Sequence, residues 1–154
     1  MDKRLDDILA LAIQREEEAY DFYMNIFSIV EDASVKDTLE FIAGEEKQHK
    51  AFLVNYREGK YGSDALRMSD VIDFKIAEYL QEPEISKDTS AQQVYLIASH
   101  REQRSHHFYT ELASLHPAGE TKTMLLSMAN EELKHKEKME YLYSNTAFPQ
   151  TSGG

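Results

Sequence analysis

The chain has 154 residues, no cysteine, and 28 acidic against 17 basic side chains, which gives a formal net charge of −11. This composition suits one domain with its own core, argues against nucleic-acid binding, and excludes disulfides, zinc–thiolate sites and iron–sulfur clusters. No apolar run approaches the roughly 20 residues that span a bilayer, and the N-terminus lacks a signal-peptide core, so we expect no membrane segment and a cytoplasmic location.

Helical periodicity runs through every long stretch between the three prolines. A first helix is expected from about Leu5 to about Glu31, where apolar residues recur at three- and four-residue steps. A second helix is expected to begin at a cap formed by Ser34 and to continue to about Arg57. A long crossover follows, in which residues 69–80 predict a short amphipathic helix.

The third helix is expected to begin at a capping box formed by Ser90 and Gln93 and to end at His116, just before a proline. Residues 118–121 form the next turn, and the fourth helix should continue to about Tyr143. Each half of the chain is then a helical hairpin. Two hairpins joined by a long crossover are typical of the ferritin-like antiparallel four-helix bundle.

The boundaries of this bundle follow from the same pattern. Residues 1–144 are expected to form one all-α domain. Residues 145–154, which contain a proline and end in Ser-Gly-Gly, are expected to form a flexible tail.

Two Glu-x-x-His pairs occur in matching contexts, one in each half. Each pair follows another glutamate by 30 residues, and the two sets are offset by 86 residues. Because the glutamate and histidine of each pair are three residues apart, both lie on one face of their helix. At a rise of about 1.5 Å per residue, the chain returns along the next helix so that each pair lies at a height similar to that of its upstream glutamate. Four carboxylates and two imidazoles are a ligand set for two metal ions, favouring iron or manganese and tolerating zinc. The predicted ligands are Glu16, Glu46, His49, Glu102, Glu132 and His135.

Several neighbouring residues have more than one interpretation. Tyr23 and Tyr109 lie two turns from the upstream glutamates, where they could donate hydrogen bonds to ligand carboxylates or simply pack in the core. His106 lies one turn after Glu102 and is expected beside the ligands or at the surface, without binding a metal ion itself. The residues expected to be solvated are Glu17, Glu18, Glu45, Glu131, His100, His107 and His116.

A family resemblance covers nearly the whole chain. The pattern Ala-x-x-x-Glu-x-x-(Ala/Ser)-x-x-Phe-Tyr followed by Ala-x-Glu-Glu-x-x-His occurs at residues 12–23 with 43–49, and again at 98–109 with 129–135. This double pattern resembles the rubrerythrin family of the ferritin-like superfamily. The resemblance implies a di-iron centre held by the six residues, with Glu46 bridging the two iron ions. It also implies a bridging role for the equivalent Glu132, a homodimer, and reaction with hydrogen peroxide or dioxygen.

The chain departs from that family in two ways. Rubrerythrins carry a rubredoxin domain whose iron is held by four cysteines, and this chain has none. They also carry an extra glutamate one turn after the third-helix ligand, where this chain has Ser105. Electrons would therefore come from an external donor protein or from ferrous iron itself.

Three functions remain open at this stage. The first is a redox enzyme that acts on peroxide or dioxygen. The second is an iron-binding module that oxidises ferrous iron for storage or delivery. The third is a helical interaction protein whose metal ions contribute only stability.

Overall fold

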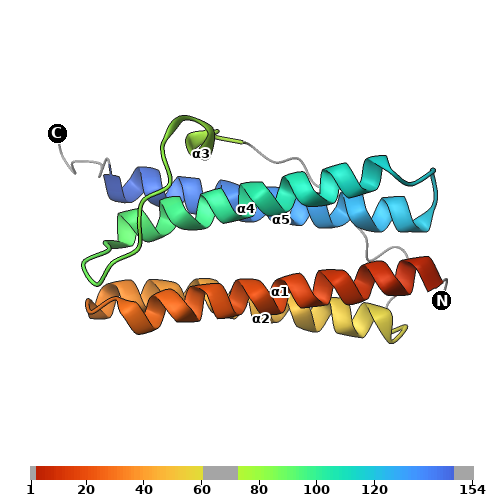
Figure 1. The fold of residues 1–154 in the computed structure, drawn as a ribbon, viewed down its shortest axis with the longest axis horizontal. Helices are drawn as coiled ribbons and strands as arrows, with labels where there is room; N and C mark the ends of the chain where they lie inside the picture. Colours follow the sequence, from red (N-terminus) through yellow and green to blue (C-terminus); the bar gives the residue numbers. More distant parts are fainter. Residues whose placement is uncertain (1–2, 61–72, 148–154) are drawn as a thin grey trace, which may run out of the picture.

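The computed structural model describes residues 3–60 and 73–147. The described residues form four long helices and one short helix, arranged as a helical bundle (Figure 1). The expected all-α fold is therefore confirmed. The helices are α1 (Lys3–Ile29), α2 (Ala33–Arg57), α3 (Ile76–Tyr79), α4 (Ala91–Ser114) and α5 (Glu120–Ala147).

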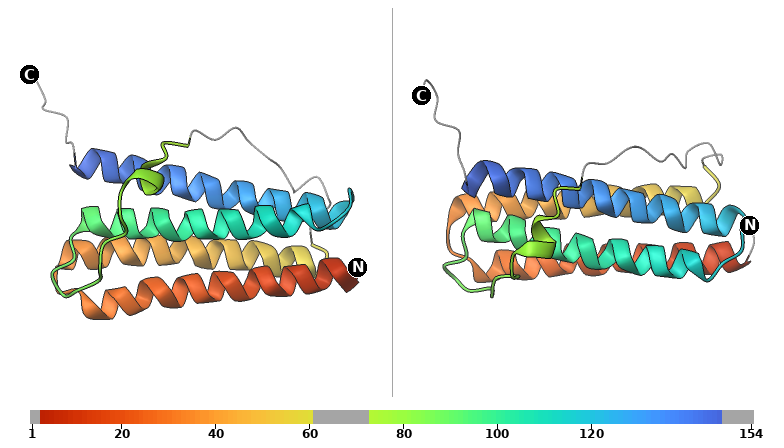
Figure 2. Two further views of the ribbon diagram at one scale, coloured as in Figure 1. Left: turned by 45° about the horizontal axis from the view of Figure 1, so that its top comes forward. Right: turned by 90° about the horizontal axis from the view of Figure 1, so that it is seen from above.

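The four long helices form two antiparallel hairpins that lie alongside each other. One hairpin is α1–α2 and the other is α4–α5, as Figure 1 and both views of Figure 2 show. Helix α3 belongs to the crossover and lies against the outer side of the α4–α5 hairpin (Figure 2). The two predicted hairpins are thus present in the described residues, and residues 73–90 belong to the described part of the crossover between them.

The start of α2 differs from the prediction. Asp32 is the N-cap, and its carboxylate accepts hydrogen bonds from the backbone N–H groups of Ser34, at 2.8 Å, and Val35, at 3.3 Å. The Ser34 hydroxyl itself donates to Asp32, so the predicted cap at Ser34 is wrong. An ionised carboxylate is the stronger acceptor for the free N–H groups of a first turn. The capping box of Ser90 and Gln93, by contrast, is confirmed.

The short crossover helix is shorter than expected. Within the described residues it covers only Ile76–Tyr79, because Lys75 adopts a left-handed backbone conformation with φ 56° directly before it. The predicted residues 69–72 lie outside the described residues. Helix α5 continues to Ala147, so residues 145–147 are helical rather than part of a tail. The remainder of the predicted tail also lies outside the described residues.

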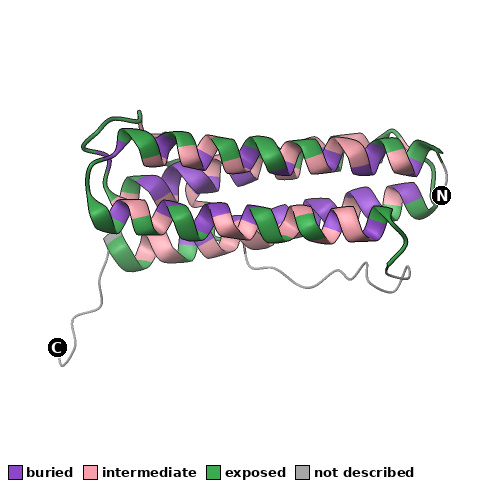
Figure 3. Cartoon of the chain, turned by 90° about the horizontal axis from the view of Figure 1, so that it is seen from below, coloured by how far each residue is buried: buried purple, intermediate pink, exposed green. Residues whose placement is uncertain are grey.

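Two apolar clusters fill the bundle, one on each side of its middle. The first cluster joins the start of α1, the end of α2, the end of α4 and the start of α5. Its residues Leu9, Leu53 and Met124 are fully buried. The second joins the opposite ends of the helices and includes Ile26 and Leu39. Figure 3 shows the buried positions repeating along the inner faces of the helices. A polar layer between these clusters is therefore shielded along the bundle axis.

None of the helices in residues 3–60 and 73–147 is both long enough and apolar enough to cross a membrane.

Candidate metal centre

The six predicted ligands come together in the layer between the two apolar clusters. The four long helices all contribute: α1 and α4 each supply one glutamate, and α2 and α5 each supply one Glu-x-x-His pair. All four carboxylate side chains are buried, with exposed fractions between 2% and 4%. The structure therefore brings together every residue of the predicted set: Glu16, Glu46, His49, Glu102, Glu132 and His135.

The two histidines direct their Nδ1 atoms toward these carboxylates. Nδ1 of His49 lies 3.6 Å from Oε1 of Glu16. Nδ1 of His135 lies 3.8 Å from Oε1 of Glu46 and 3.7 Å from Oε1 of Glu102. Groups of three ligand atoms lie within 4.8 Å of one another in three combinations, which are Glu16–His49–Glu132, Glu102–Glu132–His135 and Glu46–His49–His135.

The opposite edge of each imidazole faces a carboxylate from the other hairpin. Nε2 of His49 lies 3.6 Å from Glu131, and Nε2 of His135 lies 4.0 Å from Glu45. Carboxylates behind a histidine hold the ring and its tautomer when the other nitrogen binds a metal. Glu45 and Glu131 are half-buried. The expectation that they are merely solvated is therefore wrong, whereas Glu17 is exposed as predicted.

The carboxyl groups in this layer have strongly altered proton affinities. Burial, and then the charge of Glu132, raises the pKa of Glu16 from 4.5 to about 8. Burial and the neighbouring carboxylates likewise raise the pKa of Glu46 and of Glu102 well above the usual value. Burial also opposes ionisation of Glu132, but a hydrogen bond with Glu102 and the charge of His135 outweigh it and lower its pKa. Burial therefore favours the protonated form of three of the four carboxyl groups in the metal-free layer.

This donor set fits divalent cations. Buried carboxylates are costly without a compensating charge, and two dications would match the formal charge of four carboxylates. Oε2 of Glu16 is buried and has no hydrogen-bond partner among the described residues, so one ligand oxygen is left for a cation. Carboxylate and imidazole ligands suit iron, manganese and zinc.

The two predicted tyrosines differ although they occupy equivalent positions. The hydroxyl of Tyr23 lies 3.5 Å from Oε1 of Glu102 and donates a long hydrogen bond to it across the hairpins. The hydroxyl of Tyr109 is buried and has no hydrogen-bond partner within the part of the chain that the structure describes. Burial raises the pKa of both phenols, so both remain protonated near neutral pH. Of the two tyrosines, only Tyr23 therefore donates a hydrogen bond to a predicted ligand carboxylate.

The remaining histidines lie away from the ligand atoms. Nδ1 of His106 lies 2.8 Å from the carbonyl oxygen of Ala129, which fixes the ring beside the layer but outside the ligand sets. His107 is exposed, as predicted. Nε2 of His100 lies 2.7 Å from the carbonyl oxygen of Leu80, so this half-buried histidine contacts the crossover instead of facing solvent.

Two arginines next to the upstream glutamates join the hairpins. The guanidinium of Arg15 lies 4.0 Å from the ring centroid of Phe108, and that of Arg101 lies 4.9 Å from the ring centroid of Phe22. Arg15 also donates to the hydroxyl of Ser105 at 3.3 Å. Sequence reasoning did not assign these contacts, although the repeat places arginine before glutamate in both halves.

A second acidic cluster contains Asp73, Glu78 and Glu140. The ammonium group of Lys136 lies among these carboxylates, at 2.6 Å from Asp73 and 3.0 Å from each of the other two. The chain thus supplies the cation of this cluster itself, and the cluster joins the crossover to α5.

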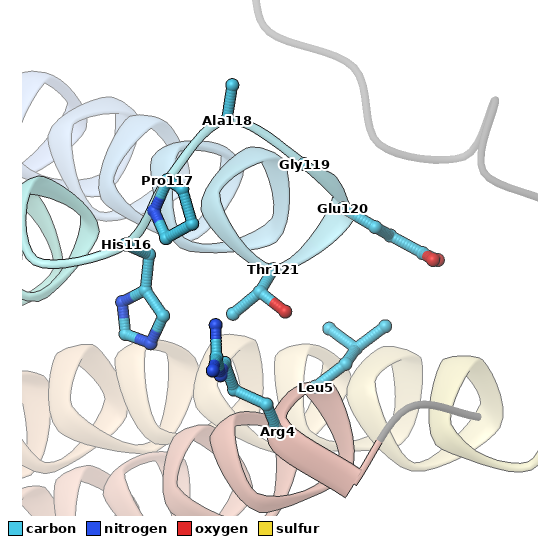
Figure 4. A pocket seen from close by; sticks show the side chains of 8 residues that line it. All are labelled: Arg4, Leu5, His116, Pro117, Ala118, Gly119, Glu120 and Thr121. Carbon is cyan, nitrogen blue, oxygen red and sulfur yellow. The ribbon is translucent and has the colours of Figure 1, made fainter.

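A separate small cleft of about 160 Å³ lies where the turn between α4 and α5 meets the first turn of α1 (Figure 4). It contains none of the six predicted ligands. His116, predicted to be at the surface, is half-buried there, and its Nδ1 lies 2.9 Å from the carbonyl oxygen of Leu112. The residues that line the cleft are Arg4, Leu5, His116, Pro117, Ala118, Gly119, Glu120 and Thr121.

No protein-family model, no curated protein and no solved structure matches this chain.

Proposed function

We propose that this chain is a rubrerythrin-like member of the ferritin-like superfamily that binds two iron ions and reacts with hydrogen peroxide or dioxygen. One observation carries the proposal: four glutamates and two histidines from four helices converge in a single buried layer. A duplicated arrangement of this kind is how four-helix bundles hold two metal ions between carboxylates.

The three-atom combinations suggest how the ligands would divide. Glu16 and His49 would hold one ion, and Glu102 and His135 the other. Glu132 belongs to a combination on each side, which is what a bridging carboxylate requires. Glu46 lies beside both histidines in the third combination and would be the second bridge, as the resemblance implies. Manganese or zinc could replace iron in such a site.

When bound, two iron ions in this layer would supply the two electrons that reduce an O–O bond. The protein itself contributes position and shielding. The apolar clusters on either side restrict water along the bundle axis. The phenol of Tyr23 stays protonated and donates to Glu102, which orients that carboxylate. Glu131 and Glu45 lie 3.6 and 4.0 Å from the Nε2 atoms of the two histidines and would orient the rings when Nδ1 binds a metal ion.

Oxidation of ferrous iron for storage or delivery is the second candidate function. The contacts of Ser105 support it. Its hydroxyl accepts a hydrogen bond from Arg15, at the position where rubrerythrins carry an exchanging glutamate. The chain also has no cysteine with which to build a rubredoxin-type electron relay. Under either candidate, electrons reach the layer from another protein or from ferrous iron used as a substrate. A bundle with purely structural ions is the third alternative.

The test is to reconstitute the protein anaerobically with ferrous iron, measure iron per chain, and mix it with peroxide or with dioxygen in a stopped-flow spectrometer. We expect two iron ions per chain and a rapid rise of near-ultraviolet ferric absorbance. A faster reaction with peroxide than with dioxygen supports the peroxidase, and multiple turnovers of ferrous iron with dioxygen support the oxidase.

Ligand variants identify the site within this experiment. Glu46→Ala and His49→Ala should abolish the fast absorbance change, whereas the exposed Glu18→Ala should leave it intact. Tight metal binding with no reaction toward either oxidant would leave only the structural alternative. Unchanged reactivity in both ligand variants would remove this layer from the mechanism.

The homodimer implied by the resemblance is also part of the proposal. Tyr79 and Phe74 of the crossover are exposed, with exposed fractions of 82% and 44%. Sedimentation at micromolar concentration tests whether two chains associate.

A further inference from the structure

The repeat of 86 residues makes the two sets of predicted ligands equivalent, and it also makes one outer face of the α1–α2 hairpin equivalent to one outer face of the α4–α5 hairpin. On the α1–α2 hairpin, this face holds a cleft of about 390 Å³ that reaches the buried side chains of Glu16 and Glu46. The corresponding face of the α4–α5 hairpin lies outside Glu102 and Glu132. The residues that line the cleft are Glu16, Glu17, Tyr20, Asp21, Glu46, Lys47 and Lys50.

The crossover covers that corresponding face. We call residues 73–82 the crossover strap. The backbone N–H of Ala77 donates to Oε2 of Glu140 at 2.8 Å, which fixes the strap to α5. The side-chain amide of Gln103 donates to Glu78 at 2.6 Å, and Arg104 donates to both carboxylate oxygens of Glu82, which fixes the strap to α4. Figure 2 shows α3 lying across this side of the hairpin.

Lys50 and Lys136 show the difference between the two faces directly, because they occupy equivalent positions in the repeat. The Lys50 side chain is 43% exposed and pairs with Glu17 at 2.9 Å on the wall of the cleft. The Lys136 side chain is 1% exposed and lies beneath the strap, 3.0 Å from Glu78. The same residue type at the same helical position is therefore open to solvent in one hairpin and enclosed in the other.

The two hairpins differ in the residues that surround the predicted ligand carboxylates, and not in the burial of those carboxylates. The four ligand carboxylates are buried to a similar extent in both hairpins. The histidines differ in the same direction as the lysines, since the His49 side chain is 21% exposed and that of His135 is 12% exposed. The cleft that reaches Glu16 also contains the carboxylates of Glu17 and Asp21, which offer oxygen ligands to a hard divalent ion outside the buried layer.

We propose that the two metal positions exchange ions at different rates. The position at Glu16 and His49 exchanges divalent cations with solvent through the α1–α2 cleft. The position at Glu102 and His135 retains its ion, because the crossover strap must open before that ion can leave. This inference rests on the proposed function only in so far as the layer binds two ions, and it does not depend on the redox reaction.

The experiment loads the protein with two equivalents of Co²⁺ and follows the loss of its visible absorbance after excess EDTA is added. We expect two phases of equal amplitude whose rate constants differ by at least about tenfold, because local opening of a hydrogen-bonded segment precedes the slower release. The variant His49→Ala assigns the phases: it should lose the fast phase and keep the slow one.

Two variants loosen the strap without touching a predicted ligand. Glu78→Gln removes the charge that faces Lys136, and Arg104→Gln removes the paired contact with Glu82. Each should accelerate the slow phase and leave the fast phase unchanged. The matched control is Arg57→Gln, which removes a two-bond contact with Asp6 on the other hairpin that is also partly exposed. It should change neither phase.

The outcomes separate this inference from the proposed function. A protein that binds no Co²⁺ contradicts the metal site itself. Two bound ions that leave in one phase contradict unequal exchange and leave the metal site intact. Strap variants that keep the helical circular dichroism of the parent chain but leave the slow phase unchanged, or accelerate both phases equally, overturn the role of the strap.

Discussion

The imidazole rings of His49 and His135 stack with their centroids 4.1 Å apart and their planes inclined by 19°, although each ring belongs to a different hairpin. Their Nδ1 atoms face the buried carboxylates and their Nε2 atoms face Glu131 and Glu45. The stacked pair therefore joins the hairpins at the height of the ligand layer. Each histidine receives its outer carboxylate from the hairpin to which it does not belong.

The outer carboxylates should tune metal affinity. Glu131→Gln replaces the charged group 3.6 Å from Nε2 of His49 with a neutral one. We expect metal affinity to fall by about tenfold, at the lower end of such effects because Glu131 is partly exposed. Competition with a chromophoric chelator measures the change. Glu18→Gln is the exposed control, and an equal loss of affinity in that variant would contradict a specific role for Glu131.

The metal-free protein should lose stability as pH rises. The pKa of Glu16 is raised from 4.5 to about 8, so the folded state keeps a proton that the unfolded state releases between these values. Stability contributed by this proton is present below about pH 4.5 and declines as pH rises through about 8. Urea unfolding at pH 5.5 and pH 8 measures the decline.

Removing the titrating group supplies the control for that measurement. Glu16→Gln should make the stability of the metal-free protein depend less on pH, since the amide carries no proton that titrates. Metal binding should show the opposite trend and strengthen with pH, because cations displace protons from the layer. A metal-free protein whose stability rises between pH 5.5 and pH 8 would contradict the raised pKa.

Equivalent tyrosines should respond differently to loss of the hydroxyl. Tyr23→Phe removes a donor to Glu102, and at 3.5 Å the expected cost is about 0.5 kcal/mol of unfolding free energy. Tyr109→Phe removes a buried hydroxyl that has no partner among the described residues, so stability should stay constant or increase. Thermal unfolding of both metal-free variants compares them directly, and a larger loss in Tyr109→Phe would refute the assignment.

The cap of α2 gives a prediction about folding alone. Asp32→Ala should lower the melting temperature by a few degrees, because two N–H groups of the first turn lose their acceptor. Ser34→Ala keeps that acceptor and should have a smaller effect. If Ser34→Ala proves the more harmful substitution in differential scanning calorimetry, Ser34 is the cap after all.

The parts of the structure that depend on local pattern were predictable. Helical periodicity located the four long helices, because each apolar face follows from spacing within one helix. The candidate ligand set was identifiable because the duplicated context distinguishes Glu16 from the adjacent Glu17. The structure brings these six residues together, as the sequence pattern predicts. Their binding of iron stays a prediction.

Features that depend on contacts between distant segments were not predictable. Glu45 and Glu131 resemble ordinary surface glutamates until the opposite hairpin brings a histidine to each. In the described part of the crossover, Asp73 and Ala77 are fixed by Lys136 and Glu140, which lie about 60 residues later in the chain. Asp37 follows Ser34 at the spacing of a capping box, which favours Ser34 as the cap, but Asp32 is an equally good capping residue and spacing does not rank the two.

The cap at Asp32 also constrains how this protein can change in length. From there α2 continues without interruption past Glu46 and His49, so the angular direction of both side chains is counted in residues from the helix start. One residue inserted between 34 and 45 would rotate both by about 100° and turn them out of the layer together. The number of residues in that first stretch of α2 therefore matters as much to metal binding as the chemistry of the side chains that follow.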